Sequence, residues 1–148
     1  MVLVFVILPA MIWPATMTGR NSSSDPQGVA VPFTEVSLQC KTMWFEPLVV
    51  NDRQAFEKAF EKQQSAGCEV DRKLKIDFQK YTFIALTKSA DCQARVSVRV
   101  TKNIPEKVYV VTIDSEYGGC RGLTPHNRGL VVDKVPTDFS IRFENLKD

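Results

Sequence analysis

The chain has 148 residues, which fits one domain of ordinary size that can bury a core. Hydrophobic residues make up 44% of it and charged residues 24%, as is typical of a globular protein. The formal net charge of +2 is too small to indicate nucleic acid or an anionic membrane as a partner.

An apolar block, residues 1–19, precedes the first charged side chain, Arg20. Pro9 and Pro14 interrupt this block, and a membrane-spanning helix needs about 20 apolar residues in a row. Its length matches the apolar region of a secretory signal, although it has no preceding Lys or Arg and no clean A-x-A site. The block therefore predicts a signal peptide or a signal anchor, with a buried core segment as a third alternative. We expect a secreted or periplasmic protein with no membrane span in its mature form.

Residues 20–30 are rich in serine and contain Pro26 and Gly28, which predicts a flexible spacer. A single β-rich domain is expected over residues 31–148, with a first strand at 31–38. The loop after this strand contains the apolar cluster Met43, Trp44 and Phe45. This cluster is either part of the core or an exposed anchor for a partner protein, and its residues are candidate partner-binding residues.

One helix is predicted at about residues 52–65. Asn51 is the expected N-cap, and Gln54 follows three residues later, as in a capping box. Phe56 and Phe60, each preceded by an alanine, recur at helical spacing and form one apolar stripe. This stripe is expected to pack into the core.

The remaining pattern is that of β-strands. Residues 80–87 are almost continuously apolar, as in a central strand, and residues 95–101 alternate strictly between polar and apolar. A turn at 102–107 and further strands at 108–113, 129–135 and 139–143 complete the pattern. We predict an α+β fold: an antiparallel sheet, a partly closed β-barrel or a sandwich of about six to seven strands, with one helix.

The four cysteines, Cys40, Cys68, Cys92 and Cys120, are an even number behind a signal-like leader, which favours disulfides. No C-x-x-C pair occurs, so neither a zinc site nor a thioredoxin-like motif is expected. A hairpin turn centred near residues 104 and 105 would bring Cys92 and Cys120 nearly opposite each other. Cys40 would then pair with Cys68, although three connectivities are possible for four cysteines.

The stretch EYGGCRGLTPHN, residues 116–127, holds Cys120 and the chain's one histidine, His126. These two could form a thiolate–imidazole pair, as in a small thiol enzyme or hydrolase. The alternative is a disulfide-bonded Cys120 beside a surface His126 that follows Pro125. No phosphate-binding, dinucleotide-binding or metalloprotease motif is present, and no cofactor or metal is predicted.

Arg95 and Arg99 lie on the polar side of the alternating strand. They are candidate partner-binding residues that could meet an acidic protein. A solvated strand face that resists edge-to-edge aggregation is the alternative interpretation.

Several short segments occur in a characteristic order: Pro32–Glu35, Val49–Asp52, Ile76–Phe78, Tyr81–Leu86, a valine-rich hairpin and a strand near Val131–Val135. This order resembles a group of small exported bacterial proteins that includes the PrcB-like domain of protease-complex accessory subunits. The resemblance implies a β-rich exported domain that binds a partner protein and is not itself an enzyme. The group tends to carry a Gly-Gly-Tyr turn after the central strand, where this chain has Ala90–Ala94.

The leading functional prediction is an exported, non-catalytic protein-interaction domain. Its partner would be another envelope or secreted protein, and it could serve as an accessory or regulatory subunit of an envelope complex such as a protease. One alternative is the thiol enzyme or hydrolase that uses Cys120 and His126. Another is a periplasmic carrier of a small ligand, which would need a roomy interior.

Overall fold

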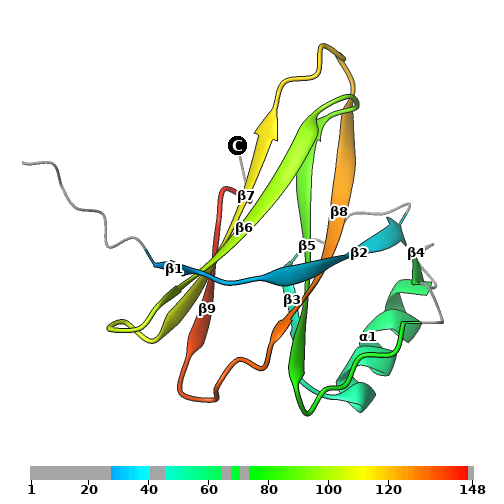
Figure 1. The fold of residues 1–148 in the computed structure, drawn as a ribbon. Coiled ribbons are helices and arrows are strands. Elements are labelled where there is room, and N and C mark those ends of the chain that lie inside the picture. Colours follow the sequence, from blue (N-terminus) through cyan, green and yellow to red (C-terminus); the bar gives the residue numbers. More distant parts are fainter. Residues whose placement is uncertain (1–27, 41–45, 65–67, 71–73, 147–148) are drawn as a thin grey trace, which may run out of the picture.

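The computed structural model describes residues 28–40, 46–64, 68–70 and 74–146, which form nine strands and one helix (Figure 1). The predicted leader, most of the predicted spacer and the cluster Met43, Trp44 and Phe45 lie outside the described residues. The elements are β1 Val29–Ala30, β2 Phe33–Cys40, β3 Leu48–Val50, α1 Arg53–Gln64, β4 Cys68–Val70, β5 Tyr81–Asp91, β6 Arg95–Asn103, β7 Val108–Glu116, β8 Leu123–Asp133 and β9 Ser140–Glu144.

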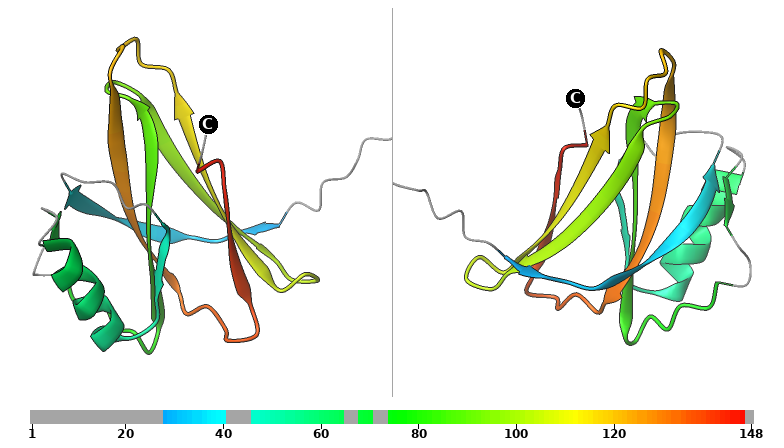
Figure 2. Two further views of the ribbon diagram at one scale, coloured as in Figure 1. Left: turned by 180° about the vertical axis from the view of Figure 1, so that it is seen from behind. Right: turned by 45° about the horizontal axis from the view of Figure 1, so that its top comes forward.

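The strands form two sheets, a four-stranded sheet in the order β1-β6-β7-β9 and a five-stranded sheet in the order β3-β5-β8-β2-β4. All strand pairs are antiparallel except β7 and β9, which run parallel. Figure 2 shows α1 on the face of the five-stranded sheet that points away from the other sheet. The predicted α+β class is confirmed, and its form is an open sandwich with a helix on one side, not a closed barrel.

The six predicted strands correspond to β2 and to β5 through β9. The strands that the sequence did not reveal, β1, β3 and β4, are only two or three residues long, too short to show a period of two. β1 falls within the predicted spacer, where Val29 lies opposite Lys102 and Ala30 opposite Thr101 of β6. The paired part of the chain therefore begins two residues before the expected domain start.

β5 is the strand that both cores share. Phe83 and Ala85 point toward α1, where the Phe83 ring lies 5.1 Å from that of Phe56. Ile84 and Leu86 point the other way, into the space between the sheets. Because successive side chains on a strand point to opposite faces, burial on both sides explains the nearly continuous apolar run.

The N-terminus of α1 differs from the prediction. Asp52 is the N-cap, and its Oδ1 accepts the Ala55 amide at 2.7 Å. Asn51 Oδ1 instead accepts the Thr82 hydroxyl of β5 at 2.6 Å, so this side chain ties the start of the helix to the sheet. The helix begins at Arg53, one residue later than expected.

β6 and β7 form the predicted hairpin. Arg95 lies opposite Glu116 and Asn103 opposite Val108, which leaves a four-residue turn at 104–107. The predicted alternation on β6 is confirmed, with Arg95 and Arg99 exposed and the intervening valines turned toward the other sheet. The open end of this hairpin therefore lies near residues 92–95 and 116–120.

Candidate functional site

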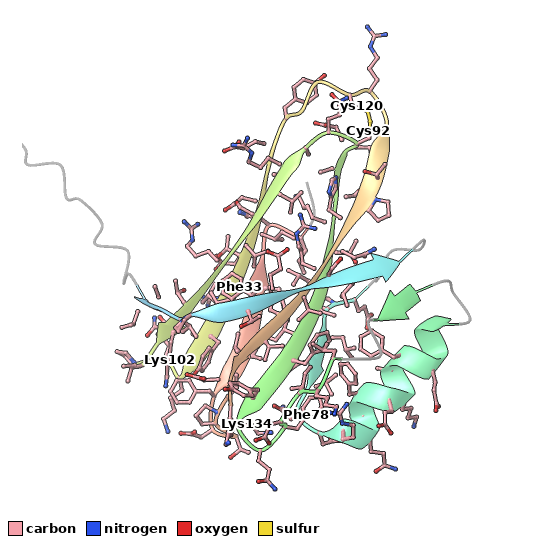
Figure 3. All side chains as sticks on the ribbon, turned by 45° about the vertical axis from the view of Figure 1, so that its right-hand side comes forward. Phe33, Phe78, Cys92, Lys102, Cys120 and Lys134 are labelled. Carbon is pink, nitrogen blue, oxygen red and sulfur yellow. A yellow bond between two sulfur atoms is a disulfide. The ribbon has the colours of Figure 1, made fainter. Side chains whose placement is uncertain are left out.

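A disulfide between Cys92 and Cys120 closes one end of the sandwich, with the two Cα atoms 5.6 Å apart. It joins the turn between β5 and β6 to the connection between β7 and β8 (Figure 3). The bond lies at the open end of the β6–β7 hairpin, where the spacing of the two cysteines predicted it. We call residues 91–95 and 116–123 the stapled tip.

Asp91, the last residue of β5, holds the two loops of the stapled tip together. Its Oδ1 accepts the amide of Gln93 at 2.9 Å, and its Oδ2 accepts the amide of Gly118 at 2.7 Å. The Gly118 amide, with smaller effects from the Gln93 and Cys120 amides and from His126, holds the pKa of this carboxyl below its ordinary value, although desolvation opposes the shift. Asp91 is therefore a charged link between segments far apart in sequence.

The backbones of the two loops also touch directly. A Cβ atom built on Gly118 would overlap the backbone carbonyl of Gln93, so only glycine fits at this position. The next residue, Gly119, has a φ of 91°, in the region that side chains other than glycine rarely adopt. The glycines thus permit the close approach that the disulfide and Asp91 hold in place.

His126, which the sequence predicted as a surface residue after Pro125, is part of strand β8. β8 begins at Leu123, so His126 is half-buried and lies opposite Lys88 of β5. Its Nε2 lies 3.0 Å from the backbone oxygen of Asp91 and 3.3 Å from Thr124 Oγ1. A carbonyl oxygen can only accept a hydrogen bond, so His126 Nε2 carries the proton and donates a hydrogen bond to the Asp91 backbone oxygen. This hydrogen bond links the His126 ring to the last residue of β5.

The structure does not bring Cys120 and His126 together as a reactive pair. The Cys120 sulfur is bonded to Cys92, and the His126 ring is directed at the Asp91 carbonyl. Among the described residues, no hydrogen bond joins the two side chains. A thiolate at Cys120 would first require reduction of the disulfide.

The stapled tip presents two large apolar side chains to solvent. Tyr117 is 80% exposed and Leu123 is 73% exposed, the highest values among the large hydrophobic residues that the structure describes. They lie three residues before and three residues after Cys120, and the exposed Arg121 lies between them. We call Tyr117, Arg121, Leu123 and the neighbouring Arg95 the tip surface.

Of the other predicted partner-binding residues, Met43, Trp44 and Phe45 lie outside the described residues, and Arg99 lies away from the stapled tip. Arg99 lies further along β6, and its guanidinium is 3.5 Å from the Asp114 carboxylate across the hairpin. Asp114 also accepts a hydrogen bond from Asn145 Nδ2 at 2.7 Å, so Arg99 belongs to a surface network on the outer sheet face. Of the two arginines that the sequence singled out, only Arg95 lies at the stapled tip.

The second predicted cysteine pair is consistent with the strand pairing. Cys40 of β2 and Cys68 of β4 are directly opposite each other in the antiparallel register. This backbone register is what the predicted Cys40–Cys68 bridge requires.

A groove of about 500 Å³ runs beside β8, next to the stapled tip. It is lined by Glu35 and Ser37 of β2 and by residues 125–128 of β8. Arg128 Nε lies 2.9 Å from Glu35 Oε1, and Arg128 Nη2 approaches the backbone oxygen of Val96 at 3.5 Å. Glu35 and Arg128 therefore form an ion pair in this groove, although the buried Arg128 Nε has no hydrogen bond of good geometry.

Neither a metal-binding cluster nor a membrane-spanning helix is present among the described residues. No group of three or more His, Cys, Asp and Glu side chains is placed so that it could hold a metal ion. None of the described helical structure is long and apolar enough to cross a membrane.

Comparisons of the chain with protein-family models, with curated proteins and with solved structures found no match.

Proposed function

We propose that this protein is an exported, non-catalytic interaction domain that binds another envelope or secreted protein through the tip surface. The observation that carries the proposal is the position of the two most exposed large apolar side chains. Tyr117 lies in the connection after β7 and Leu123 is the first residue of β8, so they flank the segment that the Cys92–Cys120 bond and the Asp91 carboxylate hold. Two such exposed side chains, one on each side of a disulfide-bonded cysteine, favour contact with a partner over a role in the protein's own core.

The residue types of the tip surface support this function. Tyrosine and arginine are enriched among the residues that dominate interface energetics, because they offer a large contact area together with hydrogen bonds. A loop that is already rigid loses little conformational entropy on binding, so more of the contact energy contributes to affinity. Tyr117 and Arg121 are thus the strongest candidates for anchors, with Leu123 as an apolar neighbour.

Export is supported by the disulfide and by the signal-like leader. Disulfides persist in oxidising compartments and are uncommon in the cytosol. The resemblance to accessory subunits of protease complexes extends the proposal to one class of partner: an envelope protease that this domain assists or restrains. In that role the domain needs a binding surface and no catalytic residues of its own.

The test is affinity capture from an envelope extract of the source organism under non-reducing conditions. Bait proteins carry Tyr117→Ala, Leu123→Ala or the control substitution Ile104→Ala. Ile104 is also a large apolar residue, 60% exposed, but it lies in the turn at the other end of the same hairpin. A partner retained by the unchanged protein and by Ile104→Ala, and lost with both tip variants, supports the proposal. Equal recovery with all four baits would contradict it.

A further inference from the structure

The end of the sandwich opposite the stapled tip contains a second groove, of about 500 Å³. Figure 3 shows Lys134 at this end, beside Phe78 and far from Cys92 and Cys120. The apolar wall of this groove is formed by Val49, Val135, Phe139 and Ile141. Its polar part is formed by Asn51 and Lys134. We call these six residues the Lys134 groove.

Two hydrogen bonds hold the ammonium group of Lys134. Nζ donates to the backbone oxygens of Asn51 at 2.7 Å and of Phe78 at 2.8 Å. Both acceptors are neutral, and among the described residues no carboxylate lies within ion-pair distance of this Nζ. An ammonium group has three donors, so one N–H of Lys134 is left for a further acceptor.

Asn51 supplies a second donor at the same place. Thr82, which is fully buried, accepts the Val135 amide at 3.0 Å and donates its hydroxyl to Asn51 Oδ1 at 2.6 Å. Because Oδ1 of Asn51 is the acceptor, its Nδ2 group keeps its N–H donors, and Asn51 is one of the residues that line the groove. The same Thr82 hydroxyl therefore holds the Asn51 side chain and the backbone of Val135.

We propose that the Lys134 groove binds a small carboxylic acid with an aliphatic tail. The carboxylate would accept hydrogen bonds from Lys134 Nζ and from Asn51 Nδ2, and the tail would lie on Val135, Phe139 and Ile141. A carboxylate is the favoured headgroup because the two backbone carbonyls that hold Lys134 Nζ are neutral and leave its positive charge without a counter-charge. A hydrogen bond between an ammonium group and a carboxylate is also stronger than one between neutral groups. The volume is within the range of small-ligand sites. This site is independent of the tip surface and of its protein partner.

The test uses octanoate as the probe and two-dimensional ¹H–¹⁵N NMR as the measurement, with 1-octanol as the uncharged control. Octanoate is expected to shift the amide signals of Val135, Thr137 and Ile141 while those of Tyr117 and Gly118 stay in place. Lys134→Gln should weaken octanoate binding about tenfold or more, as expected for a lost hydrogen bond between charged groups. Lys134→Arg keeps the charge and should retain more of the affinity.

Because Lys134 also holds backbone carbonyls, its replacement could perturb the fold. Thr137→Trp provides a second variant, since Thr137 is exposed at the edge of the groove and a large ring there would fill the space. This variant should abolish the octanoate shifts while leaving the remaining spectrum unchanged. Equal affinity for 1-octanol and octanoate, shifts scattered over the surface, or unaltered binding by Thr137→Trp would each overturn the proposal.

Discussion

Asp91 Oδ2 accepts the backbone amide of Gly118 at 2.7 Å, which connects the end of β5 to the segment after β7, 27 residues further along the chain. The same carboxylate accepts the Gln93 amide through its other oxygen. A group with these partners is most stabilising when it is ionised. The stapled tip is therefore held by a covalent bond and by one charged side chain.

The first prediction concerns the loss of thermal stability at acid pH through the Asp91 carboxyl. The pKa of Asp91 is lowered in the folded protein relative to its ordinary value of 3.8, chiefly by the Gly118 amide. A lowered carboxyl pKa contributes stability above the unfolded pKa, and this contribution is lost as the pH falls through the folded pKa. Asp91→Asn should therefore lower Tm near neutral pH, and its difference from the unchanged protein should shrink below about pH 4. Thermal unfolding across this pH range measures both effects.

A comparison variant for that experiment is Asp138→Asn. Lys107, which lies 2.9 Å away, also lowers the pKa of Asp138, but here the cause is an exposed ion pair. Salt screens such a pair, so the effect of Asp138→Asn should fade at high ionic strength. The effect of Asp91→Asn should persist there because its partners are backbone amides. Identical salt dependence of the two variants would contradict the role assigned to Asp91.

The second prediction concerns the disulfide. Cys92 and Cys120 are separated by 28 residues, and a loop of this length corresponds to roughly 3–4 kcal/mol of stabilisation in the chain-entropy model. The double variant Cys92→Ser/Cys120→Ser should lose about that amount of unfolding free energy in a denaturant titration. Alkylation of the folded, non-reduced protein followed by mass spectrometry should leave Cys120 unmodified. Rapid alkylation of Cys120 near neutral pH would instead favour the thiol-enzyme interpretation.

The third prediction concerns the glycines of the stapled tip. Gly118→Ala should cost roughly 1–3 kcal/mol, because its Cβ would overlap the Gln93 backbone, which cannot move aside easily. Gly119→Ala should cost about 1–2 kcal/mol through its φ of 91°, although its Cβ would have open space. Gly122→Ala is the control, since only the Cys120 sulfur lies near, at 3.9 Å. Chemical unfolding should rank Gly122→Ala as the mildest; equal costs at all three positions would count against the close loop contact.

The fourth prediction concerns Asp52, the N-cap of α1. Asp52→Ala should lower the unfolding free energy by about 1 kcal/mol and reduce helical circular dichroism, because the Ala55 amide loses its acceptor. Asp52→Ser should restore most of the loss, since serine is also a good N-cap. If Asp52→Ser behaved like Asp52→Ala, the capping role of Asp52 would be wrong.

The sequence predicted the helix and those strands in which the pattern of apolar and polar residues extends over many positions. The alternation of Arg95 to Thr101 correctly predicted a half-buried strand, and the apolar run of β5 correctly predicted a central strand. The cysteine spacing around one turn predicted the Cys92–Cys120 bond. The predicted Asn51 cap was wrong because adjacent Asn and Asp residues both suit the position, and the buried Thr82 hydroxyl, a tertiary partner, holds Asn51.

The candidate site was predicted less completely than the fold. Tyr117 and Leu123 lie in a glycine-rich stretch where sequence alone does not show which side chains face solvent. Asp91 draws its partners from Gln93 and from Gly118, and the second of these contacts depends on strand register. The residues of the Lys134 groove likewise come from parts of the chain that are far apart in sequence. These parts are β3 with the residue after it, the connection between β8 and β9, and β9 itself. The apolar character of Tyr117 and Leu123, three residues on either side of Cys120, is the one signal that could have indicated the tip surface.

The most direct test of the tip surface is site-specific photocrosslinking in the native envelope. A benzophenone amino acid is placed at position 117 in one protein and at position 104 in another, with the disulfide intact in both. The proposed function predicts a discrete crosslinked product of this protein with one other protein from position 117 and none from position 104. No product from position 117, or the same product from both positions, would contradict it.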